Sequence, residues 1–117
     1  NSKKIYKSIE IVYGLRNFIG NANKFSKSKV FINLKSDNNF TEITIEDDGD
    51  GYPSDILSKI GEPYLKSTDK NSGLGLGLFI GKTLLEKNFA TVNCWNSQTR
   101  SGAEVTIKWK NKDLFNL

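Results

Sequence analysis

Three glycines at alternate positions, Gly73, Gly75 and Gly77, stand directly before an apolar segment with helical spacing. Because glycine has no Cβ, the backbone N–H groups of such a run can approach a ligand closely, and the dipole of a following helix favours negative charge there. This segment therefore favours a fold in which a phosphate lies at the start of a helix.

Two common nucleotide-binding folds do not fit the surroundings of these glycines. A dinucleotide-binding fold needs a strand immediately before the glycines and an acidic residue about 20 positions later, and a P-loop needs Gly-Lys-Ser/Thr. Here residues 61–72 are polar and aperiodic, and Leu78 follows the run. Both folds are disfavoured, and we expect a mobile loop at residues 61–72.

Apolar spacing predicts two long helices and a short one. Residues 5–25 carry apolar side chains at three- and four-residue steps, which places them on one face of a helix. These side chains are Ile5, Ile9, Val12, Tyr13, Ile19 and Ala22. Residues 74–87 are expected to form the second long helix, and Ser54 to cap a brief helix after the acidic segment.

Alternating apolar and polar residues predict four strands. The first two, at residues 30–35 and 43–46, are joined by a polar turn and form an antiparallel pair. The last two, at residues 91–96 and 105–109, are separated by turn residues.

The order of these elements predicts an α/β (α+β) two-layer sandwich, in which helices cover one face of a mixed, mainly antiparallel sheet. At 117 residues the chain is long enough for one domain with its own core, and we expect one domain over residues 1–117. Residues 111–117 are expected to form a flexible tail.

Composition excludes several classes of function. The chain has no histidine, which removes Ser-His and Cys-His catalysis and most zinc sites. Its net charge is +4, but the lysines are scattered, so we expect no nucleic-acid partner. The single cysteine, Cys94, cannot form an internal disulfide and is expected in a strand of the core. We expect no signal peptide or membrane span in these residues.

An acidic turn, Asp47-Asp48-Gly49-Asp50-Gly51, directly follows the second predicted strand. A carboxylate at a strand end can accept a hydrogen bond from an amino group, and the glycines permit a tight turn. A calcium-binding EF-hand loop fails as an alternative, because its ligand pattern and its glutamate at the twelfth position are missing. Taken alone, the segment is equally well explained as a plain turn.

A third feature is the trio Asn17, Asn21 and Lys24, whose spacing places them on the same face of the first helix. Amide oxygens can complete the coordination of a Mg²⁺ whose other ligands are waters and phosphate oxygens, and an ammonium group can meet phosphate charge. Taken alone, the trio is more simply explained as the exposed polar side of an amphipathic helix.

In this order the three features resemble the boxes of one superfamily of ATPases. Residues 17–26 resemble the N box of histidine kinases, residues 47–53 the G1 box and residues 73–78 the G2 box. The resemblance covers nearly the whole chain. It is to the GHKL superfamily with its Bergerat ATP-binding fold, and within it to the catalytic domain of bacterial sensor histidine kinases.

A narrower resemblance is to the redox-responding RegB/PrrB type of sensor kinase. It rests on residues 13–17, 61–64, 75–86 and 102–109. In that type, sensing depends on segments upstream of the catalytic domain.

The resemblance implies roles for individual residues. Asp47 would receive the adenine amino group, Gly49 and Gly51 would shape the base pocket, and Asn21 would ligate Mg²⁺. Residues 61–72 would be a lid over the nucleotide, hinged at the glycine run. The other implied nucleotide contacts are Asn17, Lys24, Lys66, Gly73, Leu74, Gly75, Leu76 and Gly77.

Two residues depart from the family pattern. Asp48 stands where asparagine is commoner, which is expected to add negative charge near the nucleotide. Ala103 follows Gly102 where many members have threonine, so a water held by a hydroxyl beside the adenine would need another partner.

The resemblance implies a protein histidine kinase domain that binds ATP with Mg²⁺ and transfers the γ-phosphoryl group. The acceptor would be a histidine on a separate dimerisation domain upstream, and a response regulator would receive the group next. No catalytic residue is assigned, because the chain lacks the phosphoacceptor histidine. We expect the fragment to be a monomer, and its parent a homodimer anchored in the inner membrane with this domain in the cytoplasm.

Two alternatives stay open at this point. One is another GHKL enzyme, either an ATPase of the Hsp90, MutL or gyrase kind or a serine kinase of the anti-sigma kind. The ATPases generally carry a glutamate base where Asn17 stands. The other alternative is a degenerate module that binds nucleotide without catalysis.

Overall fold

The computed structural model describes residues 2–58, 72–98 and 101–114, and in the two long helices it describes side chains from Ile9 and Gly77 onward. The elements are α1 (Ser2–Phe25), β1 (Val30–Ser36), β2 (Phe40–Asp47), α2 (Ser54–Leu57), α3 (Ser72–Lys87), β3 (Thr91–Asn96), β4 (Ala103–Lys110) and α4 (Asn111–Leu114). The predicted helices and strands are all found, most of them extended by one to three residues.

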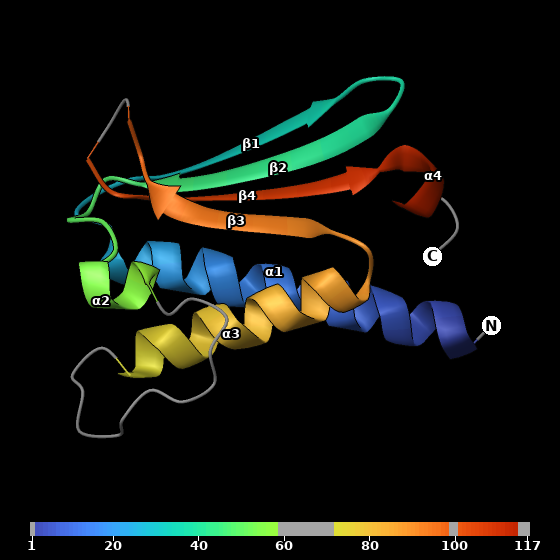
Figure 1. The fold of residues 1–117 in the computed structure, drawn as a ribbon, viewed down its shortest axis with the longest axis horizontal. Helices are drawn as coiled ribbons and strands as arrows, with labels where there is room; N and C mark the ends of the chain where they lie inside the picture. Colours follow the sequence, from blue (N-terminus) through green and yellow to red (C-terminus); the bar gives the residue numbers. More distant parts are fainter. Residues whose placement is uncertain (1, 59–71, 99–100, 115–117) are drawn as a thin grey trace.

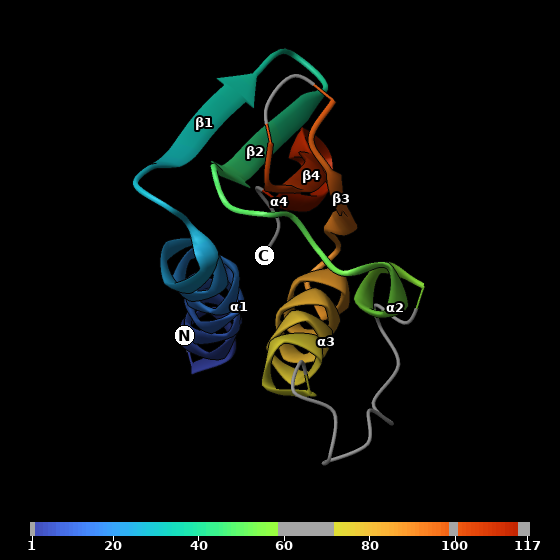
Figure 2. The ribbon, with the colours of Figure 1, turned by 90° about the vertical axis from the view of Figure 1, so that its left-hand side faces the viewer.

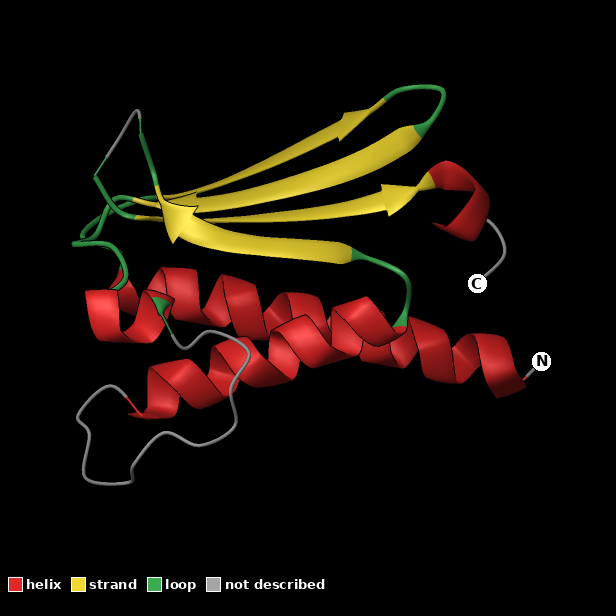
Figure 3. Cartoon of the chain, in the orientation of Figure 1, coloured by secondary structure: helices red, strands yellow, loops and turns green. Residues whose placement is uncertain are grey.

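The molecule has two layers (Figure 1). Four strands form one sheet in the order β1-β2-β4-β3, and α1 and α3 lie side by side beneath one face of it (Figure 2). The predicted two-layer fold is confirmed, with the two long helices and the strands in separate layers and α4 at the end of the sheet (Figure 3). The three pairings among the described strands are all antiparallel.

The core lies between the sheet and the two long helices. Along β4 the side chains alternate strictly, so that Ala103, Val105, Ile107 and Trp109 are buried and their neighbours are not. Phe18 of α1 and Leu85 of α3 fill the same layer, each exposed by at most 1%. This packing holds the end of β2 close to the last turns of α1.

The buried face of α1 differs from the prediction. Ile9, Val12 and Tyr13 are exposed, each by more than half, although their spacing predicted a core face. Of the predicted residues, Ala22 is buried and Ile19 packs against the core, where they are joined by Phe18, Ile11 and Leu15, which the spacing did not select. The helix has apolar residues on two faces, so spacing alone did not determine which one is buried.

Two ends of the chain also differ from expectation. Ser54 does not cap α2: Pro53 occupies the N-cap position without a side-chain hydrogen bond. Residues 111–114 are not a loose tail but a helical turn. The side chain of Asn111 accepts from Thr41 Oγ1 at 2.7 Å and donates to the carbonyl of Asp37 at 2.7 Å. No helix in the described part of the chain combines the length and the apolar character needed to cross a bilayer.

Candidate functional site

A cavity of about 190 Å³ opens where β2 ends, between α1, the start of β4 and the acidic turn. Its walls come from three parts of the chain. They are Phe18, Asn21, Ala22 and Phe25 of α1, Ile45, Asp47, Ala103 and Val105 of the sheet, and Asp50, Gly51, Tyr52 and Pro53 of the segment between β2 and α2. The cavity is therefore largely apolar, with a few polar groups that can orient a ligand.

Asp47 is the buried carboxylate of this cavity, exposed by 3%. Its Oδ1 accepts from the backbone N–H of Gly49 at 2.8 Å and from that of Ala103 at 3.4 Å. No described residue donates to Oδ2, so one carboxylate oxygen is left for a ligand. The predicted acceptor at the strand end thus lies in the cavity wall, and its orientation is set by two backbone amides.

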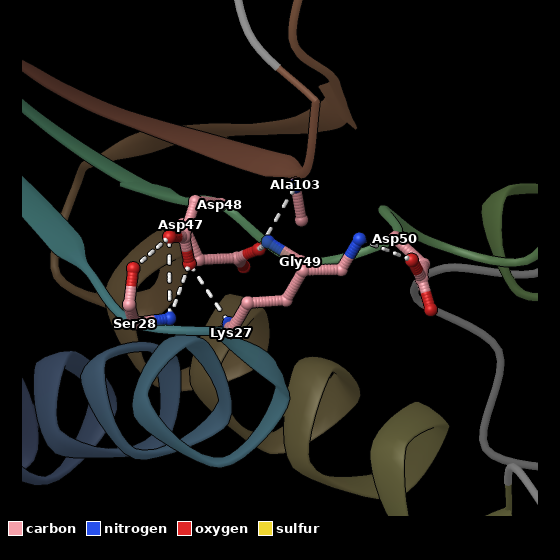
Figure 4. A network of polar contacts seen from close by, with 7 residues as sticks. All are labelled: Lys27, Ser28, Asp47, Asp48, Gly49, Asp50 and Ala103. Carbon is pink, nitrogen blue, oxygen red and sulfur yellow. Dashed lines mark hydrogen bonds and ion pairs between the residues drawn. The ribbon is translucent and has the colours of Figure 1, made fainter.

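Asp48 points the other way, toward the turn between α1 and β1 (Figure 4). Its carboxylate accepts from the backbone N–H of Lys27 at 2.8 Å, from that of Ser28 at 3.0 Å and from the Ser28 hydroxyl at 2.7 Å. The Ser28 hydroxyl, followed by backbone N–H groups, holds the pKa of Asp48 well below its usual range. The expected negative charge beside the nucleotide is therefore not found, because Asp48 ties the acidic turn to the end of α1.

The two glycines of the acidic turn are required by close approaches of the backbone. A Cβ on Gly49 would lie 2.1 Å from the carbonyl oxygen of Phe25, at the end of α1. Gly51 has a φ of 84°, a region that residues with a Cβ rarely adopt. Gly51 lines the cavity, whereas Gly49 lies behind it and lets the turn pack against α1.

The three polar residues of α1 lie in different surroundings. Asn21 lines the cavity, and its Nδ2 is the buried side-chain atom without a hydrogen-bond partner among the described residues. Asn17 donates from Nδ2 to the carbonyl of Tyr13 at 2.9 Å. Lys24 is exposed, with its Nζ 5.4 Å from the ring centre of Phe25. Of the trio, only Asn21 contributes to the cavity wall.

The glycine run lies within the first turns of α3 and not in a loop before it. Gly77 faces α1, where a Cβ on it would lie 3.1 Å from Asn21 Nδ2. The N and G2 segments predicted from the sequence therefore meet at Asn21. Lys66 and nearly all of the predicted lid, residues 61–71, lie outside the described residues.

The sequence of the chain is similar to those of known ATPases and sensor kinases. The profile described as "Histidine kinase-, DNA gyrase B-, and HSP90-like ATPase" matches residues 7–113. The chain belongs to this ATPase family. Among individual relatives, the sensor histidine kinase RegB of Cereibacter sphaeroides is 36% identical over 90% of the chain. The heme sensor protein HssS of Staphylococcus saprophyticus is 32% identical over 81% of it.

The chain spans 27% of the length of the RegB relative and 21% of HssS. Solved structures show the same fold. The catalytic domain of histidine kinase ThkA superposes with a TM-score of 0.70 at 21% identity, covering 87% of this chain and 66% of that one. The mycobacterial sensor histidine kinase MprB superposes with a TM-score of 0.67 at 24% identity, covering 84% and 70%.

Within this ATPase family fold, two cavity features were not predicted from the sequence. Tyr52 closes the cavity beside Asp47, and burial raises its pKa. Its position directly after Gly51 could have suggested it. The backbone of Tyr52 is bonded to the side chain of Asn96, 44 residues away, and no sequence signal linked the two.

Cys94 packs against the core next to Tyr52, as predicted for a strand cysteine. Burial raises the pKa of its thiol to about 12, so it is protonated and unreactive at neutral pH.

Proposed function

We propose that this domain binds Mg-ATP and delivers its γ-phosphoryl group to a histidine on a separate domain. The observation that carries the proposal is Asp47, a buried carboxylate with one oxygen held by backbone amides and the other open to an apolar cavity. Such an acceptor suits the exocyclic amino group of adenine, whereas guanine presents an acceptor at the same edge.

The size of the cavity agrees with a site for the base. At about 190 Å³ it is smaller than pockets that enclose a whole drug-sized ligand, which are roughly 300–1,000 Å³. The base would be enclosed and the triphosphate would lie outside, toward Asn21 and the start of α3. The crystal structure of full-length ShkA was solved in complex with AMPPNP, and 21% of that chain superposes on 86% of this one with a TM-score of 0.66 at 24% identity.

Asn21 fits a magnesium site. Its amide lies in the cavity wall. The buried atom without a partner is Nδ2, a donor that can bind a phosphate oxygen, and the amide oxygen, to which no described residue donates, would ligate the ion. Among the described residues no cluster of three or more acidic, histidine or cysteine side chains could hold a metal. This suits Mg²⁺, which usually takes one or two protein ligands and completes its shell with water and phosphate oxygens. The ion would neutralise phosphate charge during transfer.

Transfer to a protein is favoured over hydrolysis by the contacts of α1. A hydrolase needs a base near the γ-phosphate, but Asn17 is an amide tied to its own helix. The single acidic residue of α1, Glu10, bonds Lys87 at 2.7 Å at the far end of the helix. Among the described residues, α1 therefore offers no base for water near the cavity. Positioning and charge neutralisation are the contributions that this helix can make, and these suffice for phosphoryl transfer.

This proposal includes an acceptor histidine on another domain, a homodimeric parent protein and a response regulator that receives the phosphoryl group. It also includes a monomeric state of the isolated domain and a location in the cytoplasm, which the need for ATP favours. The triphosphate contacts of Lys24 and of the glycine run, and the lid with Lys66, complete the proposed site.

Two measurements test the proposal. Calorimetric titration should show binding of Mg-ATP and none of Mg-GTP at the same concentrations. Incubation with γ-labelled ATP and the histidine-bearing domain of the RegB relative should place acid-labile label on that domain. Steady release of inorganic phosphate without label transfer would instead identify an ATPase, and binding with neither outcome would identify a non-catalytic nucleotide module.

A further inference from the structure

We propose that Asn96 is a positioning residue of the nucleotide cavity, because its carboxamide clamps the backbone of Tyr52 and fixes the rim of the base pocket. The role in nucleotide binding rests on the proposed function, since it assumes that the cavity receives the base. The clamp itself is a property of the nucleotide-free domain.

The contact consists of two opposed hydrogen bonds. The backbone N–H of Tyr52 donates to Asn96 Oδ1 at 2.7 Å, and Asn96 Nδ2 donates to the carbonyl of Tyr52 at 3.2 Å. One carboxamide thereby exchanges both bonds with one residue, as two residues do in an antiparallel pair. The exchange also fixes the orientation of the amide, since the flipped one would face donor with donor and acceptor with acceptor.

The neighbouring glycine shows how closely the turn approaches Asn96. A Cβ on Gly51 would lie 2.6 Å from Asn96 Oδ1, so no larger residue fits between the turn and the clamp. Gly51 itself has a φ of 84°, which turns the chain so that Tyr52 presents both backbone groups to β3.

The effect of Asn96 on the cavity passes through Tyr52. Asn96 is the last residue of β3 and is not part of the cavity wall, whereas Tyr52 lies in that wall and is exposed by 8%. Asn96 also pairs with Ala103 across β3 and β4, and the N–H of Ala103 donates to Asp47. Asn96 is therefore linked to two residues of the cavity wall, Tyr52 and Ala103, and Ala103 in turn bonds Asp47.

The acidic turn is in this way held by a side chain at each end. Asp48 binds it to the turn after α1, and Asn96 binds it to the end of β3. If Asn96 is removed, the Tyr52 end of the turn is free to move although its Asp48 end stays fixed. We expect weaker binding of a rigid planar base, because the pocket must then be ordered during binding.

Three variants test this. Asn96→Ala removes both bonds. Asn96→Asp keeps an acceptor for the Tyr52 N–H but, when ionised, has no donor for the Tyr52 carbonyl. Asn93→Ala is the matched control, since Asn93 is an exposed asparagine of the same strand whose side chain points to the opposite face.

The first readout is the amide hydrogen exchange of Tyr52 without nucleotide. It should be roughly 10-fold faster in Asn96→Ala than in wild type and unchanged in Asn93→Ala, because an exchange-competent state no longer has to break the clamp. Equal exchange of Tyr52 in wild type and Asn96→Ala would overturn the clamp.

The second readout is affinity for Mg-ATP. Loss of a pair of neutral hydrogen bonds should weaken binding about 3- to 10-fold in Asn96→Ala. Asn96→Asp should bind as weakly at neutral pH but approach wild type as the pH falls and its carboxyl becomes protonated, because the acid can then donate to the Tyr52 carbonyl. A merely structural role would not give this pH-dependent rescue.

The outcomes separate the two proposals. If the Tyr52 amide of Asn96→Ala exchanges faster than in wild type but Mg-ATP affinity is unchanged, the clamp is supported and the positioning role is refuted. If the wild-type domain binds no Mg-ATP, the proposed function is refuted, and the positioning role with it. The exchange rate of the Tyr52 amide would still test whether Asn96 forms the clamp. If Asn96→Ala does not fold, Asn96→Leu, which also removes both bonds but keeps the side-chain volume, provides the exchange readout, and Asn96→Asp provides the affinity readout with its pH dependence.

Discussion

The two ends of the proposed nucleotide site differ in how far the protein alone completes them. At the base end, the acidic turn of residues 47–53 is bonded to three other parts of the chain. Asp47 bonds the start of β4, Asp48 bonds the turn after α1, and Tyr52 bonds the end of β3. At the phosphate end, Asn21 has a buried Nδ2 without a partner and Lys24 is exposed.

This difference indicates which part of the site is preformed. The base end has its polar groups oriented before a ligand arrives, which lowers the entropic cost of binding. The phosphate end leaves polar atoms for groups that the ligand brings, namely phosphate oxygens and a metal ion. Substitutions at the base end should therefore damage recognition or folding, and those at the phosphate end should damage metal-dependent binding while sparing stability.

The largest effect on nucleotide binding is expected from the replacement of Asp47. Asp47→Ala removes the acceptor for the adenine amino group and should weaken ATP binding about 10- to 150-fold, the equivalent of about 1.5–3 kcal/mol for a hydrogen bond to a charged group. The domain should remain folded. Titration of ATP and GTP into wild type, Asp47→Ala and Asp48→Asn measures this, and Asp48→Asn should lose far less, since Asp48 faces away from the cavity.

Equal ATP affinity in wild type and Asp47→Ala would refute the base pocket. Gain of GTP binding in Asp47→Ala would instead support the assignment of this carboxylate as the group that rejects guanine.

The next effect concerns the packing of the acidic turn on α1. Gly49→Ala places a Cβ 2.1 Å from a backbone oxygen, so the turn or the helix end must shift, and we expect a loss of about 1–3 kcal/mol in stability. Gly20→Ala is the control, because no atom lies within 4 Å of its added Cβ. In a helix this change should stabilise by about 0.5–1 kcal/mol. Urea unfolding of the two variants should therefore move in opposite directions.

A smaller effect separates stability from binding at the phosphate end. Asn21→Leu replaces a partly unpartnered buried amide by an apolar group of similar size, so stability should rise by about 1 kcal/mol. Mg-ATP affinity should nevertheless fall roughly 10-fold, and the difference between titrations with and without EDTA should largely disappear. Unchanged magnesium dependence in this variant would remove Asn21 from the metal site.

The sequence predicted well the features that depend on near neighbours. Alternation located β3 at its observed bounds, and a carboxylate at the end of a strand located Asp47 in the cavity wall. The resemblance to the histidine kinase boxes brought together Asn21 and Gly77, which face each other although 56 positions separate them in the sequence.

The features that the sequence did not predict depend on contacts between distant segments. Asp48 was expected near the nucleotide, but its partners Lys27 and Ser28 lie 20 or more residues earlier. The spacing of Ile9, Val12 and Tyr13 indicated that they are buried, but the face of α1 that meets the sheet is centred on Phe18 and leaves these three side chains exposed. The second long helix was expected to begin at residue 74, within the glycine run, whereas α3 begins at Ser72 and includes all three glycines although glycine disfavours helices.

The smallest expected effect is a change with pH in the contribution of Asp48 to the stability of the domain. Its pKa is lowered in the folded domain by the Ser28 hydroxyl and nearby backbone N–H groups, so its contribution to stability is fully present above the ordinary aspartate pKa of 3.8. The contribution is lost as the pH falls below that value, because the folded carboxylate resists protonation while the unfolded one takes up a proton. Asp48→Asn has no such group to protonate. The difference in urea midpoint between wild type and Asp48→Asn should therefore be constant from neutral pH to about pH 5 and shrink progressively as the pH falls from about 4 to about 2. Asp50→Asn serves as the control, and its urea midpoint should differ little from that of wild type. Asp50 is exposed, and both partners of its 3.3 Å ion pair with Lys27 are exposed to solvent. A difference between wild type and Asp48→Asn that stays constant down to pH 2 would mean that Asp48 does not hold the acidic turn through its charge, and that the base end owes its order to Asp47 and Asn96 alone.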